Sequence, residues 1–185
     1  ISTSPTMIYF GQEVGEPGAE NAGFGSATRT SIFDYVGVPT FQRWVNKHSF
    51  DGGQSTDNEK ELRDFYKRLL NFTISSEALM GNYAEIHSYN RQNVENYTRR
   101  IFSFVRWSEN EKLIIISNFD DLVNYDLDFQ IPSEIIQKWE MKEGTYILKD
   151  QLYNEVSTKL VVKNGVGVMH VKIDTLTSFI FKVTE

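Results

Sequence analysis

The chain contains no cysteine among its 185 residues. Disulfide bonds, zinc sites built from thiolates and cysteine nucleophiles are therefore excluded. The three histidines, His48, His87 and His170, are widely separated in the sequence, whereas zinc ligands usually recur at short, regular spacings. We therefore expect neither a metal site nor another cofactor in this chain.

Basic residues are fewer than acidic ones. Lysine and arginine total 19 against 25 aspartates and glutamates, which gives a formal net charge of -6. Proteins that bind nucleic acid concentrate basic residues to meet the phosphates. Here the basic residues are scattered, and Arg99-Arg100 is the one pair of adjacent arginines. The composition therefore excludes nucleic acid as a partner.

Long apolar runs are missing as well. No run approaches the ~20 residues that a membrane-spanning helix needs, and the first residues lack the basic and apolar regions of a signal peptide. We expect no membrane span. The compartment is left open, with a bacterial periplasmic or extracellular location favoured over the cytoplasm.

Two common catalytic motifs are absent. No Gly-x-Ser-x-Gly sequence is present, which argues against a serine esterase. A glycine-rich segment spans Gly11 to Gly25, but no Gly-Lys-Ser or Gly-Lys-Thr follows it, so it is not a phosphate-binding loop. Its length is typical of a functional loop.

The last 85 or so residues have the pattern of short β-strands. Apolar and polar residues alternate in several runs, and Asn164-Gly165 between two of them indicates a hairpin. The runs that we predict as strands are 101–107, 112–117, 125–131, 145–148, 159–163, 166–173 and 178–183. Their number and spacing predict an antiparallel β-sandwich.

A helix is predicted in the middle of the chain. Thr56 and Glu59 form a capping box at its start. Apolar residues then recur at helical spacing, namely Leu62, Phe65, Tyr66, Leu69 and Leu70. We also expect a short helix after Pro39 and a weaker helical segment over 76–80.

The first residues predict a strand, Thr6 to Phe10, that leads into the glycine-rich loop. Three carboxylates follow in this loop, Glu13, Glu16 and Glu20. A glycosidase site needs two carboxyl groups ~5 to 10 Å apart, and spacing within a loop does not establish that distance. An acidic, solvated loop is the favoured interpretation.

Several segments resemble the α-amylase family of glycoside hydrolases. The stretch from Ser4 to Glu13, SPTMIYFGQE, is similar to the family's eighth barrel strand, although the family has glycine and proline where this chain has Ser4 and Thr6. Residues 29–35 resemble the continuation of the following loop, and 59–72 resemble the last barrel helix. Residues 101–119, with FVR and LIIISNF, resemble the opening hairpin of the C-terminal β-sandwich.

This resemblance implies a mainly β fold: a C-terminal antiparallel β-sandwich preceded by the last strand, loop and helix of a (β/α)8 barrel. Residues 1–95 would be the remnant of the barrel and 96–185 the β-sandwich domain. The family cleaves or transfers α-1,4-glucosidic bonds with retention, using an Asp nucleophile and a Glu acid/base. By the resemblance these residues lie upstream of Ile1. We therefore expect an inactive fragment with a structural or accessory role in a parent enzyme that acts on starch or maltodextrin.

The resemblance also suggests one site residue. Arg29 is our candidate for contacting bound glucan, with pairing to a neighbouring carboxylate as the alternative, while Gln12 and Glu13 are expected to orient the loop. No catalytic or metal-binding residue is assigned, and calcium in the parent is left open. Because the strand from Met7 to Phe10 lacks neighbours, we expect it to dock elsewhere, to dimerise or to be poorly ordered.

Two alternatives come from other functional classes. In the first, the chain is a stand-alone carbohydrate-binding β-sandwich. In the second, it is a non-enzymatic subunit that has kept the tail of an amylase. For the binding module, Trp107 and Trp139 are the candidate platforms for sugar rings, although both fit packing at the ends of strands equally well.

Overall fold

The computed structural model describes residues 3, 6–17, 38–153 and 156–184. Contacts between Cα atoms divide the chain into two compact units, residues 2–71 and residues 72–185 together with Ile1. The division falls after Asn71, whereas the sequence suggests a boundary between residues 95 and 96. The structural division places residues 72–95 with the β-strands.

The first unit contains η1 (Gln12–Val14), α1 (Pro39–Val45) and most of α2 (Asp57–Ser75). The capping box at the start of α2 forms as predicted. The backbone N–H of Thr56 donates to Glu59 Oε2 at 3.1 Å, and the backbone N–H of Glu59 donates to Thr56 Oγ1 at 3.4 Å. These two bonds satisfy donors that the helix start would otherwise leave unpaired.

The predicted strand from Thr6 to Phe10 is not formed among the described residues. Residues 6–9 have no regular secondary structure, and the side chain of Met7 is 81% exposed. A β-strand needs a neighbour to accept its backbone hydrogen bonds, and none of the described segments pairs with this one. Phe10 instead packs on Phe41, with ring centroids 4.5 Å apart.

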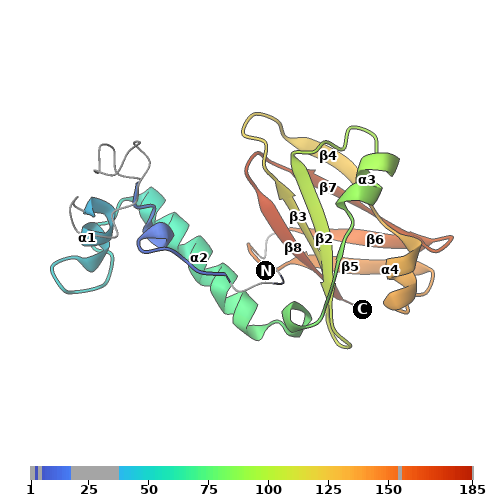
Figure 1. Ribbon diagram of the computed structural model, residues 1–185, viewed down its shortest axis with the longest axis horizontal. Coiled ribbons are helices and arrows are strands. Elements are labelled where there is room, and N and C mark those ends of the chain that lie inside the picture. The colour runs from blue at the N-terminus through green and yellow to red at the C-terminus, as the bar shows by residue number, and fades with distance from the viewer. Residues whose placement is uncertain (1–2, 4–5, 18–37, 154–155, 185) are drawn as a thin grey trace. The chain divides into compact units, whose positions relative to one another are not determined.

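The second unit is built on one antiparallel sheet of eight strands (Figure 1). The hydrogen-bonded order is β1-β2-β3-β8-β5-β6-β7-β4. The strands are β1 (Asn82–Glu85), β2 (Ile101–Trp107), β3 (Lys112–Asn118), β4 (Tyr125–Ile131), β5 (Gly144–Asp150), β6 (Ser157–Lys163), β7 (Val166–Ile173) and β8 (Ser178–Thr184). The mainly β, antiparallel fold predicted from the sequence is confirmed.

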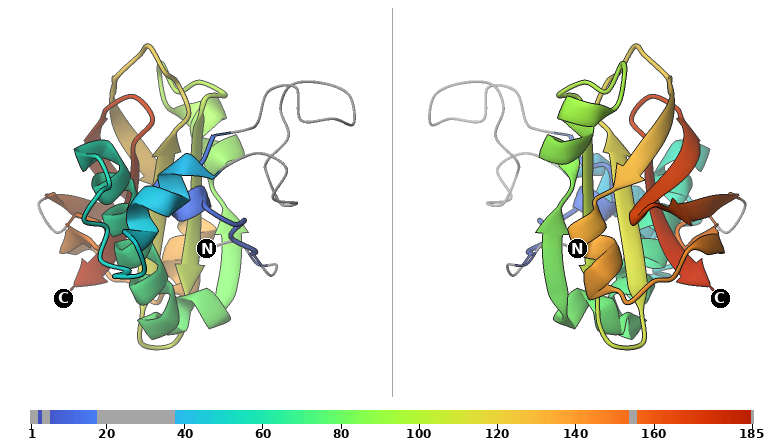
Figure 2. Two further views of the ribbon diagram at one scale, coloured as in Figure 1. Left: turned by 90° about the vertical axis from the view of Figure 1, so that its left-hand side faces the viewer. Right: turned by 90° about the vertical axis from the view of Figure 1, so that its right-hand side faces the viewer.

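The sheet curls so that its two halves enclose a single core. Buried side chains from β2, β3 and β8 pack in one cluster with those from β4, β6 and β7, including Val105, Ile114, Phe129 and Met169. Figures 1 and 2 show the two groups of strands on opposite sides of this core. The sheet therefore acts as both layers of a sandwich.

The two halves of the sheet differ in how they are buried. Strands β4, β6 and β7 alternate between buried and exposed residues, which is the pattern of a sheet with one solvated face. In β3, the four consecutive residues Leu113 to Ile116 are all buried. The half built around β3 is therefore covered on both faces.

Two short helices complete the second unit, and neither was predicted. Helix α3 (His87–Asn93) contacts both β2 and β4, and α4 (Ser133–Lys138) packs on β7. In α3 the buried amide of Asn90 donates to Gln130 O at 2.9 Å and accepts from Gln130 N at 2.8 Å. This side chain pairs with β4 as a neighbouring strand would.

A tight turn at Gly81 places β1 beside β2. The 3-10 helix η2 (Glu77–Met80) ends at Gly81, and Asn82 then pairs with Trp107. A Cβ atom at Gly81 would lie 2.1 Å from the carbonyl oxygen of Trp107. Only glycine permits this close approach of the two backbones.

None of the described helices is both long enough and apolar enough to cross a membrane.

Candidate functional site

The predicted glucan contact Arg29 lies outside the described residues, and so does Glu20. The other two loop carboxylates, Glu13 and Glu16, belong to the described residues. Glu16 Oε2 accepts a hydrogen bond from the backbone N–H of Phe41 at 2.9 Å, so it fixes the start of α1. Glu13 lies on the wall of a depression of about 430 Å³ beside α2. In this arrangement Glu16 has a structural partner, and no described contact joins it to Glu13.

Gln12 holds the segment that follows Thr6. Its Nε2 donates to Tyr66 Oη at 2.8 Å, and its Oε1 accepts from the backbone N–H of Tyr9 at 3.0 Å. These bonds connect the segment before η1 to α2. The loop that Gln12 and Glu13 were expected to orient lies mostly outside the described residues, so that role stays a prediction.

The ion pair between Arg43 and Glu59 joins α1 to α2. Arg43 Nε donates to both carboxylate oxygens of Glu59 at 3.2 Å. The hydrogen bond from Arg43 is the main reason that the pKa of Glu59 is lowered, and the backbone N–H of Thr56 adds to it. One carboxylate thus serves the helix cap and the contact between two helices.

The histidines have separate partners and form no shared site. His87 Nδ1 lies 3.2 Å from Tyr97 Oη, which also contacts Ser103 Oγ at 2.9 Å. Burial raises the pKa of Tyr97 to about 12. His170 lies between Asp126 and Asp128, at 2.8 and 2.9 Å. Within the described ranges no group of three or more His, Cys, Asp or Glu residues is arranged to hold a metal ion.

A buried carboxylate, Glu111, joins three segments of the second unit. Ser76 Oγ donates to Glu111 Oε2 at 2.6 Å, and Ala78 N donates to the same oxygen at 3.0 Å. Lys182 Nζ of β8 binds Glu111 Oε1 at 2.7 Å. Burial acts to raise the pKa of Glu111, but these hydrogen bonds together lower it. The contacts fix the segment after α2 against the sheet.

This joint lies on the outer face of the β2–β3–β8 half of the sheet. Leu113, Ile115 and Ile180 are at most 1% exposed, yet they do not belong to the core enclosed by the sheet. Helix η2 packs against β2, and the guanidinium of Arg106 donates to the carbonyl of Leu79 there. The half-sheet therefore has a second apolar layer on its outer side.

Large apolar side chains remain exposed between the end of α2 and β2. Met80 of η2 and Ile74 near the end of α2 are 91% and 85% exposed, and Tyr83 and Phe102 are also exposed. Tyr83 and Phe102 both lie against Phe104, with ring centroids 5.6 and 5.7 Å from it, and exposed apolar surface of this kind is typical of a surface that meets another protein. We call these four residues, Ile74, Met80, Tyr83 and Phe102, the apolar margin.

Helix α2 has a similar property. The face predicted to be apolar carries Leu62, Phe65 and Leu69, which are only half-buried, and no residue of α2 is buried. Amphipathic helices usually gain most of their stability by burying such a face. Within the described part of the chain, the apolar face of α2 is thus incompletely covered.

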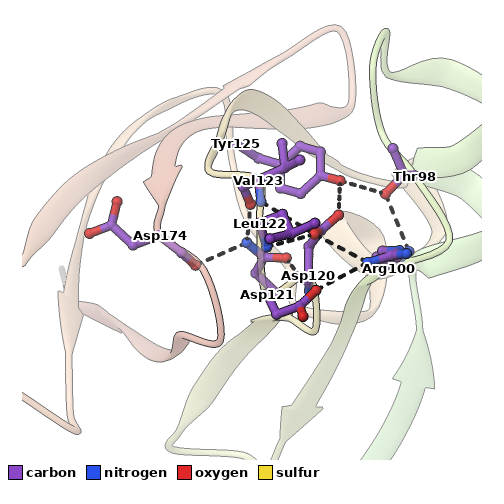
Figure 3. Close-up of polar contacts among 9 residues, drawn as sticks. Thr98, Arg100, Asp120, Asp121, Leu122, Val123, Tyr125 and Asp174 are labelled. Atoms are coloured by element: carbon purple, nitrogen blue, oxygen red, sulfur yellow. Dashed lines mark hydrogen bonds and ion pairs between the residues drawn. The ribbon is translucent and has the colours of Figure 1, made fainter.

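A polar network organises the loops at one end of the sheet (Figure 3). Asp120 Oδ1 accepts from the backbone N–H groups of Leu122 and Val123, and its Oδ2 accepts from Tyr125 Oη at 3.0 Å. Arg100 Nη1 lies 3.2 Å from Asp120 Oδ1. The hydrogen bond from Leu122 is the largest of the contacts that lower the pKa of Asp120. This network is structural, because its partners are the loop residues beside Asp120 and the first residue of β4.

The candidate sugar platforms lie side by side. The rings of Trp107 and Trp139 meet edge to face, with centroids 6.4 Å apart. Trp139 is only 4% exposed and belongs to the core, so it cannot present a ring face to a sugar. Trp139 therefore packs in the core, as the second interpretation holds, although it lies at the end of helix α4 and not at the end of a strand.

Comparisons with known proteins identify the fold. No protein-family model and no curated protein matches the chain. A noncanonic maltogenic α-amylase from Thermotoga neapolitana aligns with 96% of this chain and 32% of its own length, at 13% identity and a TM-score of 0.58. An Anoxybacillus α-amylase covers 74% of this chain and 25% of its own length, at 16% identity and a TM-score of 0.46.

A third solved structure has a similar extent. The α-amylase of Geobacillus thermoleovorans, complexed with acarbose, covers 74% of this chain and 26% of its own length, at 11% identity and a TM-score of 0.46. The chain thus spans about a third or less of the structures it matches. The structural neighbours are α-amylase family glycoside hydrolases, and the likeness seen in the sequence is confirmed at the level of the fold.

Proposed function

We propose that this chain is the C-terminal part of an α-amylase-like glycoside hydrolase that acts on α-1,4-glucans such as starch or maltodextrin. The observation that carries the proposal is the alignment of 96% of the chain with a maltogenic α-amylase. An alignment of that extent includes residues of both compact units, so the likeness is not confined to a common β-sheet. The order of the sequence motifs supports the same assignment.

The part that we propose for the chain is structural. The half-buried apolar face of α2 and the apolar margin would pack against the remainder of the parent enzyme, and the Glu111 joint would fix the β-sheet domain to the chain that enters it. In this proposal residues 1–95 still represent the end of the barrel and 96–185 the β-sandwich domain, although residues 72–95 pack with the sheet.

Catalysis would depend on residues elsewhere in the parent enzyme. Retaining glycosidases use two carboxyl groups, one as nucleophile and one as acid/base. By the resemblance to the α-amylase family, both lie before Ile1. We therefore propose that the chain by itself is inactive and that Arg29, at the loop on the substrate side, contacts bound glucan in the complete enzyme.

The alternative of a stand-alone carbohydrate-binding module loses one of its two predicted platforms, because Trp139 is buried, whereas Trp107 is half-buried. The alternative of a non-enzymatic subunit is separated from our proposal by the same experiment that tests it. The polypeptide encoded by the complete gene should be purified and incubated with maltoheptaose, and the anomeric form of the first products should be followed by proton NMR.

We expect hydrolysis that releases the α-anomer first, since a double displacement retains the configuration. First release of the β-anomer would rule out the proposed retaining chemistry. A complete polypeptide that folds but leaves maltoheptaose and soluble starch intact would instead favour the non-enzymatic subunit.

A further inference from the structure

Strand β1 forms an open edge of the eight-stranded sheet. The sheet ends in β1 on one side and in β4 on the other. The edge of β4 is partly closed, because the side chain of Asn90 in α3 binds the backbone of Gln130. Among the described residues, β1 has a strand on one side only, namely β2. An open edge of this kind is a template for pairing with another chain.

The register of β1 shows which backbone groups point outward. Ile86 N donates to Ser103 O of β2 at 3.1 Å, so these two residues form a hydrogen-bonded pair. In an antiparallel pair of strands, such residues alternate with residues whose N–H and C=O groups point away from the neighbouring strand. The backbone of Ala84 therefore faces β2, whereas the backbone groups of Tyr83 and Glu85 point to the open edge.

The side chains at this edge leave apolar surface exposed as well. Ala84 packs against the core, so Tyr83 and Glu85 lie on the opposite, outer face of the sheet. The ring of Tyr83 lies 5.6 Å from that of Phe104, which in turn lies 5.7 Å from that of Phe102. Tyr83 and Phe102 belong to the apolar margin, and both are exposed. The outward-pointing backbone groups and the exposed rings are thus neighbours.

A second copy of the chain would satisfy this edge completely. With a two-fold axis at Ala84, Tyr83 of each copy lies opposite Glu85 of the partner copy. Both outward-pointing N–H groups and both outward-pointing C=O groups of each β1 then have partners. The two Glu85 carboxylates do not lie directly opposite each other, which would be unfavourable for like charges. An interface of this kind uses the same patch on both copies.

We infer that two copies of this chain pair through their β1 strands, antiparallel to each other and about a two-fold axis at Ala84. The two sheets then continue into each other, and the exposed rings of Tyr83 and Phe102 of both copies gather along the seam. The inference does not rest on the proposed function, because it uses only the open edge and the exposed rings of the second unit.

Proline substitution tests the backbone pairing, with association measured by sedimentation velocity over a range of concentrations. Tyr83→Pro removes an outward-pointing N–H but no hydrogen bond to β2, and proline is tolerated at such edge positions. Tyr83→Ala is the matched control, since it also loses the ring but keeps the N–H. Because each dimer loses one hydrogen bond per copy, the dissociation constant should be roughly tenfold larger for Tyr83→Pro than for Tyr83→Ala.

A cysteine variant tests the position of the axis and does not require Tyr83→Pro to fold. The chain contains no cysteine, so a disulfide in Ala84→Cys can form only between two copies. The axis makes residue 84 of the two copies a non-hydrogen-bonded pair with Cα atoms about 4.5 Å apart, which a disulfide can bridge. Under mild oxidation with diamide, Ala84→Cys should cross-link roughly tenfold faster than Ser157→Cys, because pairing raises the effective concentration of the thiol. Ser157 is exposed on β6.

Each experiment has a result that would overturn the inference. A wild-type chain that is monomeric at every concentration would exclude the pairing. Equal dissociation constants for Tyr83→Pro and Tyr83→Ala would assign association to the side chains of the apolar margin alone. Cross-linking of Ala84→Cys no faster than that of Ser157→Cys would exclude the two-fold axis at Ala84. None of these results bears on hydrolysis by the parent enzyme.

Discussion

At the scale of single residues, Glu111 shows how one buried carboxylate can join distant segments. Its two oxygens bind Ser76, the N–H of Ala78 and Lys182, so the segment after α2, the β2–β3 turn and β8 meet at one point. Buried carboxylates are tolerated only when they are paired and hydrogen-bonded, and this one satisfies both conditions.

Replacement of Glu111 by glutamine should destabilise the second unit. Glu111→Gln loses the charged contact with Lys182 while it keeps the size of the side chain, and we expect the free energy of unfolding to fall by about 1–3 kcal/mol. Urea denaturation followed by circular dichroism measures this change. The exposed neighbour Glu109 provides the control, since Glu109→Gln should leave the midpoint unchanged.

The stability difference between the wild type and Glu111→Gln should also depend on pH, and its sign follows from the pKa shift. The folded state lowers the pKa of Glu111 from its ordinary value of 4.5. The carboxylate therefore stabilises the fold above pH 4.5, and this contribution is lost as the pH falls through the lowered pKa. The stability difference between wild type and Glu111→Gln should shrink on acidification. A difference that grew at low pH would contradict this assignment.

Asp120 is a second residue whose charge organises backbone. In Asp120→Asn an amide replaces a carboxylate that accepts from Leu122, Val123 and Tyr125. We expect faster hydrogen exchange at the amides of Leu122 and Val123 and a lower melting temperature. Asp121→Asn, at an exposed neighbouring position, should change neither quantity. Unchanged exchange in Asp120→Asn would show that the loops hold their shape without the network.

At the scale of elements, α3 closes the sheet through one side chain. The amide of Asn90 binds both backbone groups of Gln130 in β4. Asn90→Ala would leave those groups without this partner, and the free energy of unfolding should fall by about 2 kcal/mol. Thermal or urea unfolding measures the loss. Asn93→Ala in the same helix removes an exposed amide that binds Tyr89 O and should cost much less; equal losses would refute the closing role.

Several strands and the start of α2 could be predicted from the sequence. The alternation over 125–131 and 166–173 gave β4 and β7 at their observed bounds, and Asn164-Gly165 marked the turn between β6 and β7. The capping box located the start of α2 because its two hydrogen bonds are local. Signals of this kind depend only on residues close in sequence.

The elements that were missed depend on distant partners. Strand β1 has four residues and forms because the turn at Gly81 brings it alongside β2. Helices α3 and α4 have seven and six residues, too few to show a clear helical period. The outer apolar layer could not be predicted either. The apolar run Leu113 to Ile116 of β3 indicates a buried strand, but it does not show which segment covers each face.

The same reasoning applies to the candidate site. The surroundings of Trp139 come from β2, β3, α4 and β5, which are distant in sequence, so spacing in the sequence gives no hint of them. Trp107 and Trp139 were singled out for their chemistry, but their burial depends on how β2 and α4 pack. Arg29 stays a prediction.

At the scale of the whole molecule, the exposed apolar residues predict self-association of the chain. Ile74 and Met80 of the apolar margin should drive concentration-dependent association, because water-exposed apolar surface is costly. In sedimentation velocity, the wild-type chain should associate as its concentration rises. The double variant Ile74→Lys/Met80→Lys should stay monomeric. Leu176→Lys, an exposed position at the loops after β7, is the control and should still associate. A wild-type chain that is monomeric at all concentrations would contradict this prediction.

The central claim is that the chain supports an α-glucan hydrolase without carrying its catalytic carboxylates. The most direct test is the initial rate of reducing-end release from maltoheptaose by the purified, folded 185-residue chain. We predict a rate equal to that of the buffer blank. Turnover that rises with chain concentration and is abolished by Glu13→Gln would contradict the claim, because it would place a catalytic carboxylate within this chain.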